Sequence, residues 1–164
     1  MNPQYRHIFN KASIDLTTLE TVLDVGCGEG IFSNFLHAQG IKVTAIDKEN
    51  QPELHTGIKF EKTTFEDFES GEVFDLVHAR NVVPFMENKP KQVARMLTMG
   101  RHILFTFFGP HDPWQNLVIN KEEIVPILKD VEILYSSEEE FVGKTMNGDK
   151  KPWHIFTYVV KTGL

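Results

Sequence analysis

Three glycines within five residues form the stretch of this chain whose spacing most clearly predicts chemistry. They occupy positions 26, 28 and 30 in the run Val-Leu-Asp-Val-Gly-Cys-Gly-Glu-Gly over residues 22–30. Glycine has no Cβ and tolerates positive φ, so a backbone rich in glycine can approach a ligand closely. The apolar residues before this turn and the apolar helical pattern over 31–36 predict a strand, a tight turn and a helix. The pattern favours a ligand-binding loop, with an ordinary glycine turn of an α/β protein as the alternative.

The spacing of the glycines separates one class of ligand from another. The dinucleotide fingerprint G-x-G-x-x-G would place its third glycine at position 31, where this chain has Ile31. The chain instead has G-x-G-x-G, with Asp24 two residues before the first glycine. A nicotinamide-dependent oxidoreductase is therefore the least favoured class of enzyme.

Two positions further along the chain fit a cofactor site at the edge of a sheet. The apolar strand predicted over 41–46 ends in Asp47, and Phe74-Asp75-Leu76-Val77 predicts another buried strand. In open α/β sheets, ligands bind at the carboxyl ends of the strands. A carboxylate with two acceptor oxygens suits a pair of neighbouring hydroxyl donors. Asp47 is thus a candidate ligand-binding residue, and the alternative is a solvated aspartate in a turn.

Taken together, the Asp24–Gly30 turn, Asp47 and the Phe74–Val77 strand resemble the motifs of the class I S-adenosylmethionine (SAM) dependent methyltransferases, over the whole chain. The resemblance implies that the glycine loop passes under the methionine part of SAM and that Asp47 accepts both ribose hydroxyls. It implies this set of cofactor-binding residues: Asp24, Gly26, Cys27, Gly28, Gly30, Asp47, Lys48, Thr64, Phe65 and His78.

The chain departs from the family pattern at the expected adenine contact. Thr64 stands where the family usually has an Asp that reaches the adenine amino group, and the backbone N–H of Phe65 is expected at a ring nitrogen. Glu66 or Asp67 is an alternative adenine ligand. Such departures leave open a second hypothesis, a non-catalytic SAM-binding or partner-binding protein, because fold alone does not establish function.

The residues expected to act on the methyl acceptor follow from the reaction. Methyl transfer from SAM is a direct displacement at the sulfonium methyl, for which the protein mainly supplies alignment and a dry site. A general base is needed only where the nucleophile carries a proton. The catalytic candidates are His78, Arg80 and His111, with His154 as a further possible base. Arg80 suits an anionic substrate; the alternatives are a salt bridge for Arg80 and structural roles for the histidines.

The order of strand and helix patterns predicts a single domain over residues 1–164. We expect a three-layer, Rossmann-like α/β sandwich whose mostly parallel seven-stranded sheet ends in an antiparallel C-terminal hairpin. The strands are predicted at 21–25, 41–46, 58–62, 73–77, 102–108, 131–136 and 154–160, and the helices at 4–12, 30–38, 88–98 and 120–129. In the family, an N-terminal helix often closes over the cofactor, so Tyr5, His7 and Phe9 are candidates to face it; the alternative is a surface helix.

Composition limits the classes of partner. The 164 residues carry 17 Lys plus Arg and 23 Asp plus Glu, a net charge of −6, which makes a nucleic-acid substrate unlikely. No insertion that would form a recognition domain follows the predicted strands, and in this the chain resembles small methyltransferases of the tellurite-resistance type, which act on small molecules. Methylation of a protein or nucleic acid is a third hypothesis.

Cysteine and histidine usage limits the setting and the metal chemistry. The single cysteine, Cys27, excludes an intrachain disulfide, and neither a signal-like apolar stretch nor an apolar run of membrane-spanning length is present. We therefore expect a cytoplasmic protein without a membrane segment. The seven histidines show no ligand spacing along the sequence, so the sequence predicts no metal site.

Overall fold

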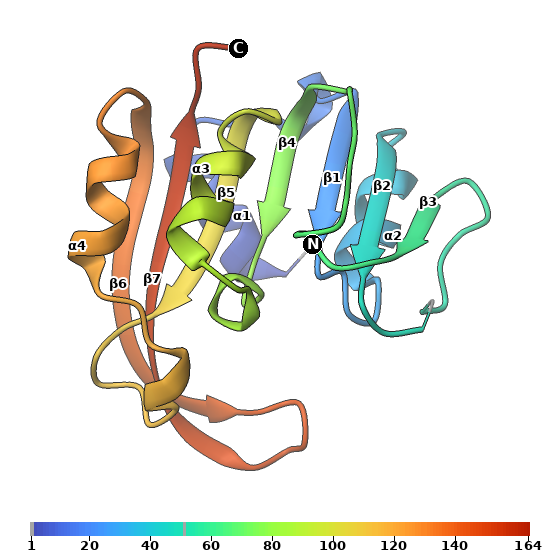
Figure 1. The fold of residues 1–164 in the computed structure, drawn as a ribbon. Coiled ribbons are helices and arrows are strands. Elements are labelled where there is room, and N and C mark those ends of the chain that lie inside the picture. The colour runs from blue at the N-terminus through green and yellow to red at the C-terminus, as the bar shows by residue number, and fades with distance from the viewer. Residues whose placement is uncertain (1, 51) are drawn as a thin grey trace.

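The computed structural model describes residues 2–50 and 52–164, which form a seven-stranded sheet with helices on both faces (Figure 1). The strand order is β3-β2-β1-β4-β5-β7-β6. The strands are β1 (Thr21–Val25), β2 (Lys42–Asp47), β3 (Lys59–Lys62), β4 (Phe74–Ala79), β5 (Gly100–Phe108), β6 (Glu132–Lys144) and β7 (Lys150–Lys161). The first five strands pair in parallel, whereas β7 pairs antiparallel with both β5 and β6. This arrangement confirms the predicted fold.

Alternating side chains of the strands divide the core into two clusters, one on each face of the sheet. Val22 belongs to the cluster with residues of α1 (Pro3–Lys11) and α2 (Ile31–Ala38), and the next residue, Leu23, belongs to the cluster with α3 (Lys89–Met96). Successive residues of a strand point to opposite faces, so a strand buried on both faces must be apolar at nearly every position. Most positions of β1 and β4 are apolar as this requires, and Asp24 and His78 are the buried polar exceptions.

The C-terminal third differs in detail from the sequence-based expectation. The helix predicted over 120–129 is a single turn, α4 (Lys121–Ile124), followed by the 3₁₀ helix η4 (Val125–Leu128). Pro126 lacks the N–H that a continuing α-helix needs, which explains the change. β6 and β7 also extend well beyond the predicted spans, so that their hairpin projects past the edge of the sheet (Figure 1).

Three further 3₁₀ helices complete the described elements: η1 (Leu16–Thr18), η2 (Val83–Phe85) and η3 (Gln115–Leu117). Of the helices in the described part of the chain, none combines the length and apolar character needed to cross a bilayer.

Candidate functional site

The glycine turn joins β1 to α2 and adopts a conformation that requires glycine. Gly26, Gly28 and Gly30 have φ values of 66°, 54° and 76°. These values lie in the left-handed region, which other residues adopt only with strain. The N–H groups of Gly26 and Cys27 donate to the Ile46 carbonyl at 2.9 and 3.0 Å, which ties the loop to the end of β2. A Cβ at Gly28 would meet no atom within 4 Å, so the backbone there faces open space.

Asp47 ends β2 beside this loop. Its Oδ2 accepts a hydrogen bond from the Gly28 N–H at 2.9 Å, and its Oδ1 accepts one from the Glu49 N–H at 2.9 Å. Each carboxylate oxygen has a second lone pair, so both oxygens keep acceptor capacity for a ligand. Lys48, the next predicted cofactor residue, is exposed. The structure therefore brings the predicted ribose ligand and the predicted methionine loop into direct contact.

The two residues predicted at the adenine are placed differently from each other. The Thr64 hydroxyl donates to Asp67 Oδ2 at 3.1 Å and accepts from the Asp67 N–H at 3.3 Å, so the side chain forms a local turn. The Phe65 ring is 3% exposed and packs in the core below the guanidinium of Arg95. Only the backbone of Phe65 is thus available to a ligand, as the family resemblance implies.

A buried chain of hydrogen bonds connects Asp24, His78 and Tyr5. Asp24 and His78 are directly opposite in the β1–β4 register, and Asp24 Oδ1 lies 2.8 Å from His78 Nδ1. His78 Nε2 lies 2.9 Å from the Tyr5 hydroxyl, and Ser33 donates to Asp24 Oδ2 at 2.6 Å. A carboxylate only accepts hydrogen bonds, so His78 donates from Nδ1 and accepts the Tyr5 proton at Nε2. Asp24 thereby orients an imidazole whose basic nitrogen faces α1.

The N-terminal helix contributes more than a surface helix would. Tyr5 stacks on Phe32 with ring centroids 4.5 Å apart, and the Arg80 guanidinium lies 4.8 Å from the Tyr5 ring centroid. Arg80 also donates to the side chain of Gln4. Burial raises the pKa of Tyr5 above its ordinary value, although the nearby Arg80 opposes this. Of the three candidates on this helix, Tyr5 reaches the site, Phe9 is buried in the core, and His7 is exposed beside Tyr135.

Part of this site lines one cavity of about 710 Å³, whereas Gly28, Gly30, Asp47, Lys48, Thr64 and Phe65 lie outside its wall. The predicted residues on its wall are Asp24, Gly26, Cys27, His78 and Arg80. Sequence reasoning did not include Asn2, Glu29, Ile31, Phe32, Phe35, Asn81 and Met146 in the predicted site. Met146 comes from the turn of the β6–β7 hairpin, a contact that no local sequence signal reveals. A larger cavity of about 1040 Å³ lies against α2, but the described residues around it include none of the predicted cofactor ligands.

The environment of Cys27 suppresses thiolate formation. Burial, together with the charges of Asp24 and Asp47, raises the pKa of the thiol to about 12. Because the thiolate is the nucleophilic form of cysteine, Cys27 serves the loop as a small side chain and not as a nucleophile.

His111 lies elsewhere, so the structure does not bring together all three catalytic candidates. It follows β5 in an exposed loop, where its Nδ1 lies 2.7 Å from Glu140 Oε1. Its ring stacks on that of His154, with centroids 4.8 Å apart. The cavity that contains His78 and Arg80 is not lined by either residue.

Trp114 and Trp153 surround a side chain of the protein itself. The Lys151 ammonium lies 3.5 Å from the ring centroid of Trp153, 4.3 Å from that of Trp114 and 4.9 Å from that of Phe108. It also forms an ion pair with Asp112, and both charged residues are buried. This aromatic box, made by Phe108, Trp114 and Trp153, is therefore filled by a cation from β7.

Comparisons with known proteins match the chain to methyltransferases. A family model described as "Methyltransferase domain" matches residues 1–133. Curated relatives include the "Ubiquinone biosynthesis O-methyltransferase" of Rickettsia conorii, 35% identical over 115 residues, which cover 57% of this chain and 39% of the relative. The protein of the same name from Rickettsia typhi is 28% identical over an alignment of 176 positions, which covers 86% of this chain and 69% of the relative. The chain spans less than half the length of the first curated relatives it matches.

Solved structures show the same fold at low sequence identity. TehB from Haemophilus influenzae superposes with a TM-score of 0.76 at 19% identity, covering 96% of this chain and 62% of TehB. The N-methyltransferase NodS from Bradyrhizobium japonicum, in complex with S-adenosyl-L-homocysteine, gives a TM-score of 0.69 at 16% identity, covering 99% of this chain and 89% of NodS.

Proposed function

Because the chain belongs to the methyltransferase domain family, for which SAM is the methyl donor, we propose that it transfers a methyl group from SAM to a small-molecule nucleophile. The observation that carries the proposal is the contact between the glycine loop and Asp47 beside the cavity lined by Asp24, His78 and Arg80. A cavity of about 710 Å³ lies within the usual range for small-molecule and cofactor sites, roughly 300–1,000 Å³.

The residues around the glycine loop fit SAM as the methyl donor. The open space above Gly28 admits a ligand against the backbone, and Asp47 keeps acceptor capacity for two hydroxyls. When bound, SAM supplies a methyl group already activated on a sulfonium. The protein then has to align the acceptor with that group and to exclude water. The apolar rings of Phe32 and Phe35 on the cavity wall help to exclude water.

The hydrogen-bonded chain suits an acceptor that must lose a proton. A hydroxyl of the acceptor can give its proton to the Tyr5 oxygen while the Tyr5 proton passes to His78 Nε2, 2.9 Å away. The buried Asp24 carboxylate, bonded to His78 Nδ1, stabilises the imidazolium that results. The raised pKa of Tyr5 keeps its hydroxyl protonated at neutral pH, as such a relay requires. We assign to Arg80, which lies beside Tyr5, the binding of an anionic group of the acceptor.

The compact layout supports a small acceptor. The connection from β4 to α3 contains only one 3₁₀ turn, η2, and the net charge of −6 disfavours a polyanionic substrate. The names of the Rickettsia relatives place them in ubiquinone biosynthesis as O-methyltransferases, which supports a small acceptor here as well.

Two measurements test the proposal in sequence. Calorimetry should show binding of SAM and of S-adenosylhomocysteine, and no binding at millimolar ligand would refute the assignment. SAM labelled in its methyl group is then incubated with the protein and a fractionated cell extract. Label in the metabolite fraction is the expected result. Label only in proteins or nucleic acids would contradict the small acceptor, and binding without any labelled product would favour a non-catalytic SAM-binding protein.

A further inference from the structure

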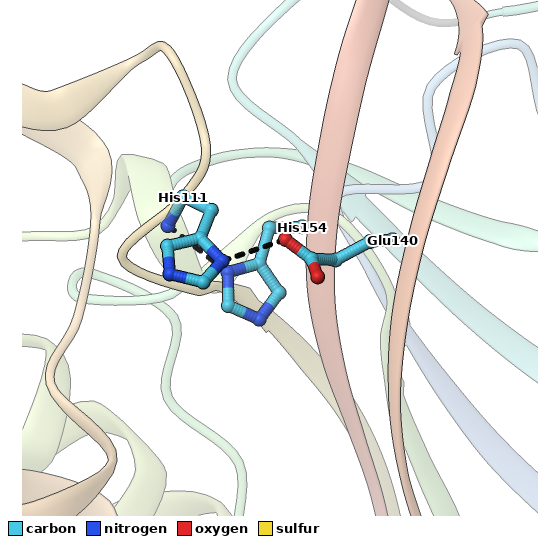
Figure 2. Close-up of side chains that lie close together, drawn as sticks. All are labelled: His111, Glu140 and His154. Carbon is cyan, nitrogen blue, oxygen red and sulfur yellow. Dashed lines mark hydrogen bonds and ion pairs between the residues drawn. The ribbon is translucent and has the colours of Figure 1, made fainter.

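A second cluster of chemically active side chains lies on the hairpin side of the sheet, outside the cavity described above. It contains His111 from the loop after β5, Glu140 from β6 and His154 from β7 (Figure 2). His111 and His154 are 43 residues apart, and His111 and Glu140 are 29 apart. Glu140 and His154 are paired directly across the β6–β7 ladder, so their side chains share one face of the hairpin.

The backbone holds His154 tightly against the loop that carries His111. A Cβ at Gly109 would lie 2.5–2.7 Å from three atoms of the His154 ring, closer than any real contact. The Gly109 N–H also donates to the His154 carbonyl at 2.8 Å. Glycine at this position therefore allows the loop to approach the imidazole, which is 1% exposed.

The hydrogen bonds of His154 fix which of its nitrogens carries the proton. The His111 N–H donates to His154 Nδ1 at 3.0 Å, so Nδ1 carries no proton. The proton is on Nε2, which lies 2.8 Å from Glu138 Oε1. Histidines that bind metals commonly donate their other ring N–H to a carboxylate in this way. The Nδ1 atom faces His111 and accepts its N–H (Figure 2), so a metal ion at Nδ1 takes the place of that hydrogen bond.

From this arrangement we propose that His111, Glu140 and His154 bind one divalent transition-metal ion of the zinc class. The ligands are the Nδ1 atoms of the two histidines and a carboxylate oxygen of Glu140. Candidate ligand atoms of the three residues lie within 4.8 Å of one another. In a tetrahedral site with ligands at about 2.1 Å, two ligand atoms lie roughly 3.4 Å apart, so the most distant pair must close by about 1 Å or slightly more. His111 and Glu140 are exposed and have the freedom to do so.

The chemistry of the ligand set selects the ion. Two imidazoles and one carboxylate suit zinc, cobalt, nickel or copper, whereas magnesium and calcium prefer ligand sets made entirely of oxygen. At present a proton bridges His111 Nδ1 and Glu140 Oε1, which are 2.7 Å apart. The metal takes the place of that proton, which moves to Nε2 of the exposed His111 ring, so that the ligand is a neutral imidazole. The ion also offsets the repulsion among the consecutive acids Glu138, Glu139 and Glu140.

A bound ion joins the loop after β5 to both strands of the hairpin. Because these three segments are distant in sequence, the crosslink should stabilise the folded state against the unfolded chain. The sequence alone predicts no metal site, since the ligands come together only through the register of β6 and β7.

The test is zinc binding by the full-length chain with its affinity tag removed. Equilibrium dialysis should give one zinc per chain, and zinc should raise the melting temperature in the absence of SAM. His111→Ala and Glu140→Gln should lose this ion and the thermal shift, because each removes one of three ligands. Both positions are exposed, so the variants should keep the circular dichroism spectrum of the wild type. Glu138→Gln should weaken zinc binding roughly 10–100-fold, because it removes the carboxylate that accepts the Nε2 proton of His154 and orients the ring.

Two matched controls separate this site from general binding by acids and histidines. Glu139→Gln changes the neighbouring acid, whose side chain points to the opposite face of β6, and His7→Ala removes an exposed histidine on α1. Both should bind zinc as the wild type does. Cobalt in place of zinc should give visible bands without a thiolate charge-transfer band, which excludes Cys27 as a ligand. No zinc bound by the wild type, or unchanged binding by His111→Ala and Glu140→Gln, would overturn the proposal.

Discussion

On the cofactor side of the sheet, the buried polar groups line an open cavity, whereas on the hairpin side they are paired with each other inside the protein. Asp24 and His78 are adjacent across β1 and β4, and the chain of bonds ends at Tyr5 on the wall of a cavity. Asp112 and Lys151 instead form an ion pair inside an aromatic box made by the protein itself.

The difference indicates that the charged groups of the cofactor side contribute mainly to ligand binding and those of the hairpin side mainly to folding. The cofactor side keeps acceptor capacity on Asp47 and an open cavity, so substitutions there should change ligand binding more than folding. The hairpin side neutralises its buried charges internally, so substitutions there should change folding more than SAM binding. Variants in each region test whether ligand binding and folding separate in this way.

The largest expected effect is on the hairpin side. Asp112→Ala leaves the Lys151 ammonium buried without its carboxylate partner, and breaking a buried ion pair typically costs about 3–5 kcal/mol of the free energy of unfolding. Urea denaturation measures this loss. The double variant Asp112→Ala, Lys151→Met removes both charges and should recover part of the stability. A loss below about 1 kcal/mol in the single variant would show that the ion pair does not hold the hairpin.

The next largest effect is on the cofactor side. Asp47→Ala removes the acceptor of the ribose hydroxyls and the partner of the Gly28 N–H. Hydrogen bonds to charged groups contribute about 1.5–3 kcal/mol, so the Kd for SAM should rise roughly 10–100-fold. Calorimetry measures the Kd, and Glu49→Ala, at an exposed residue two positions along, is the matched control. An unchanged Kd for Asp47→Ala would remove the ribose assignment.

The same distinction explains how much the sequence could predict. The glycine turn, Asp47 and the β4 strand were predicted because each depends on a local pattern, and the seven-stranded fold followed from the order of such patterns. The aromatic box and the His111–Glu140–His154 cluster depend on the register of a hairpin longer than predicted. The charged residues over 137–151 gave little indication of that pairing, because the alternation typical of a half-buried strand is missing there.

A smaller effect is expected from Tyr5→Phe, which keeps the ring stacked on Phe32 but removes the hydroxyl bonded to His78. If the hydroxyl relays a proton, kcat should fall by about tenfold, the value of one hydrogen bond of roughly 1.4 kcal/mol, with little change in the Kd for SAM.

The same variant should change the pH dependence of stability. The pKa of Tyr5 is raised in the folded state, so the protonated hydroxyl contributes to the free energy of unfolding below about pH 10, and this contribution is lost as the pH rises through the folded pKa. Tyr5→Phe should therefore reduce the alkaline loss of stability seen in urea denaturation.

The smallest effect is expected at Cys27, within the cofactor loop itself. The loop depends on glycine conformations and on backbone donors to Ile46, so Cys27→Ser should change the Kd for SAM by no more than about twofold. With the pKa of the thiol near 12, alkylation by iodoacetamide at pH 8 should be much slower than that of a free cysteine and should accelerate only in strongly alkaline solution. Rapid alkylation at pH 8, or loss of methyl transfer in Cys27→Ser, would mean that the thiol has a chemical role. The partial burial of Cys27 and the charges of Asp24 and Asp47 oppose that role, because they disfavour the thiolate.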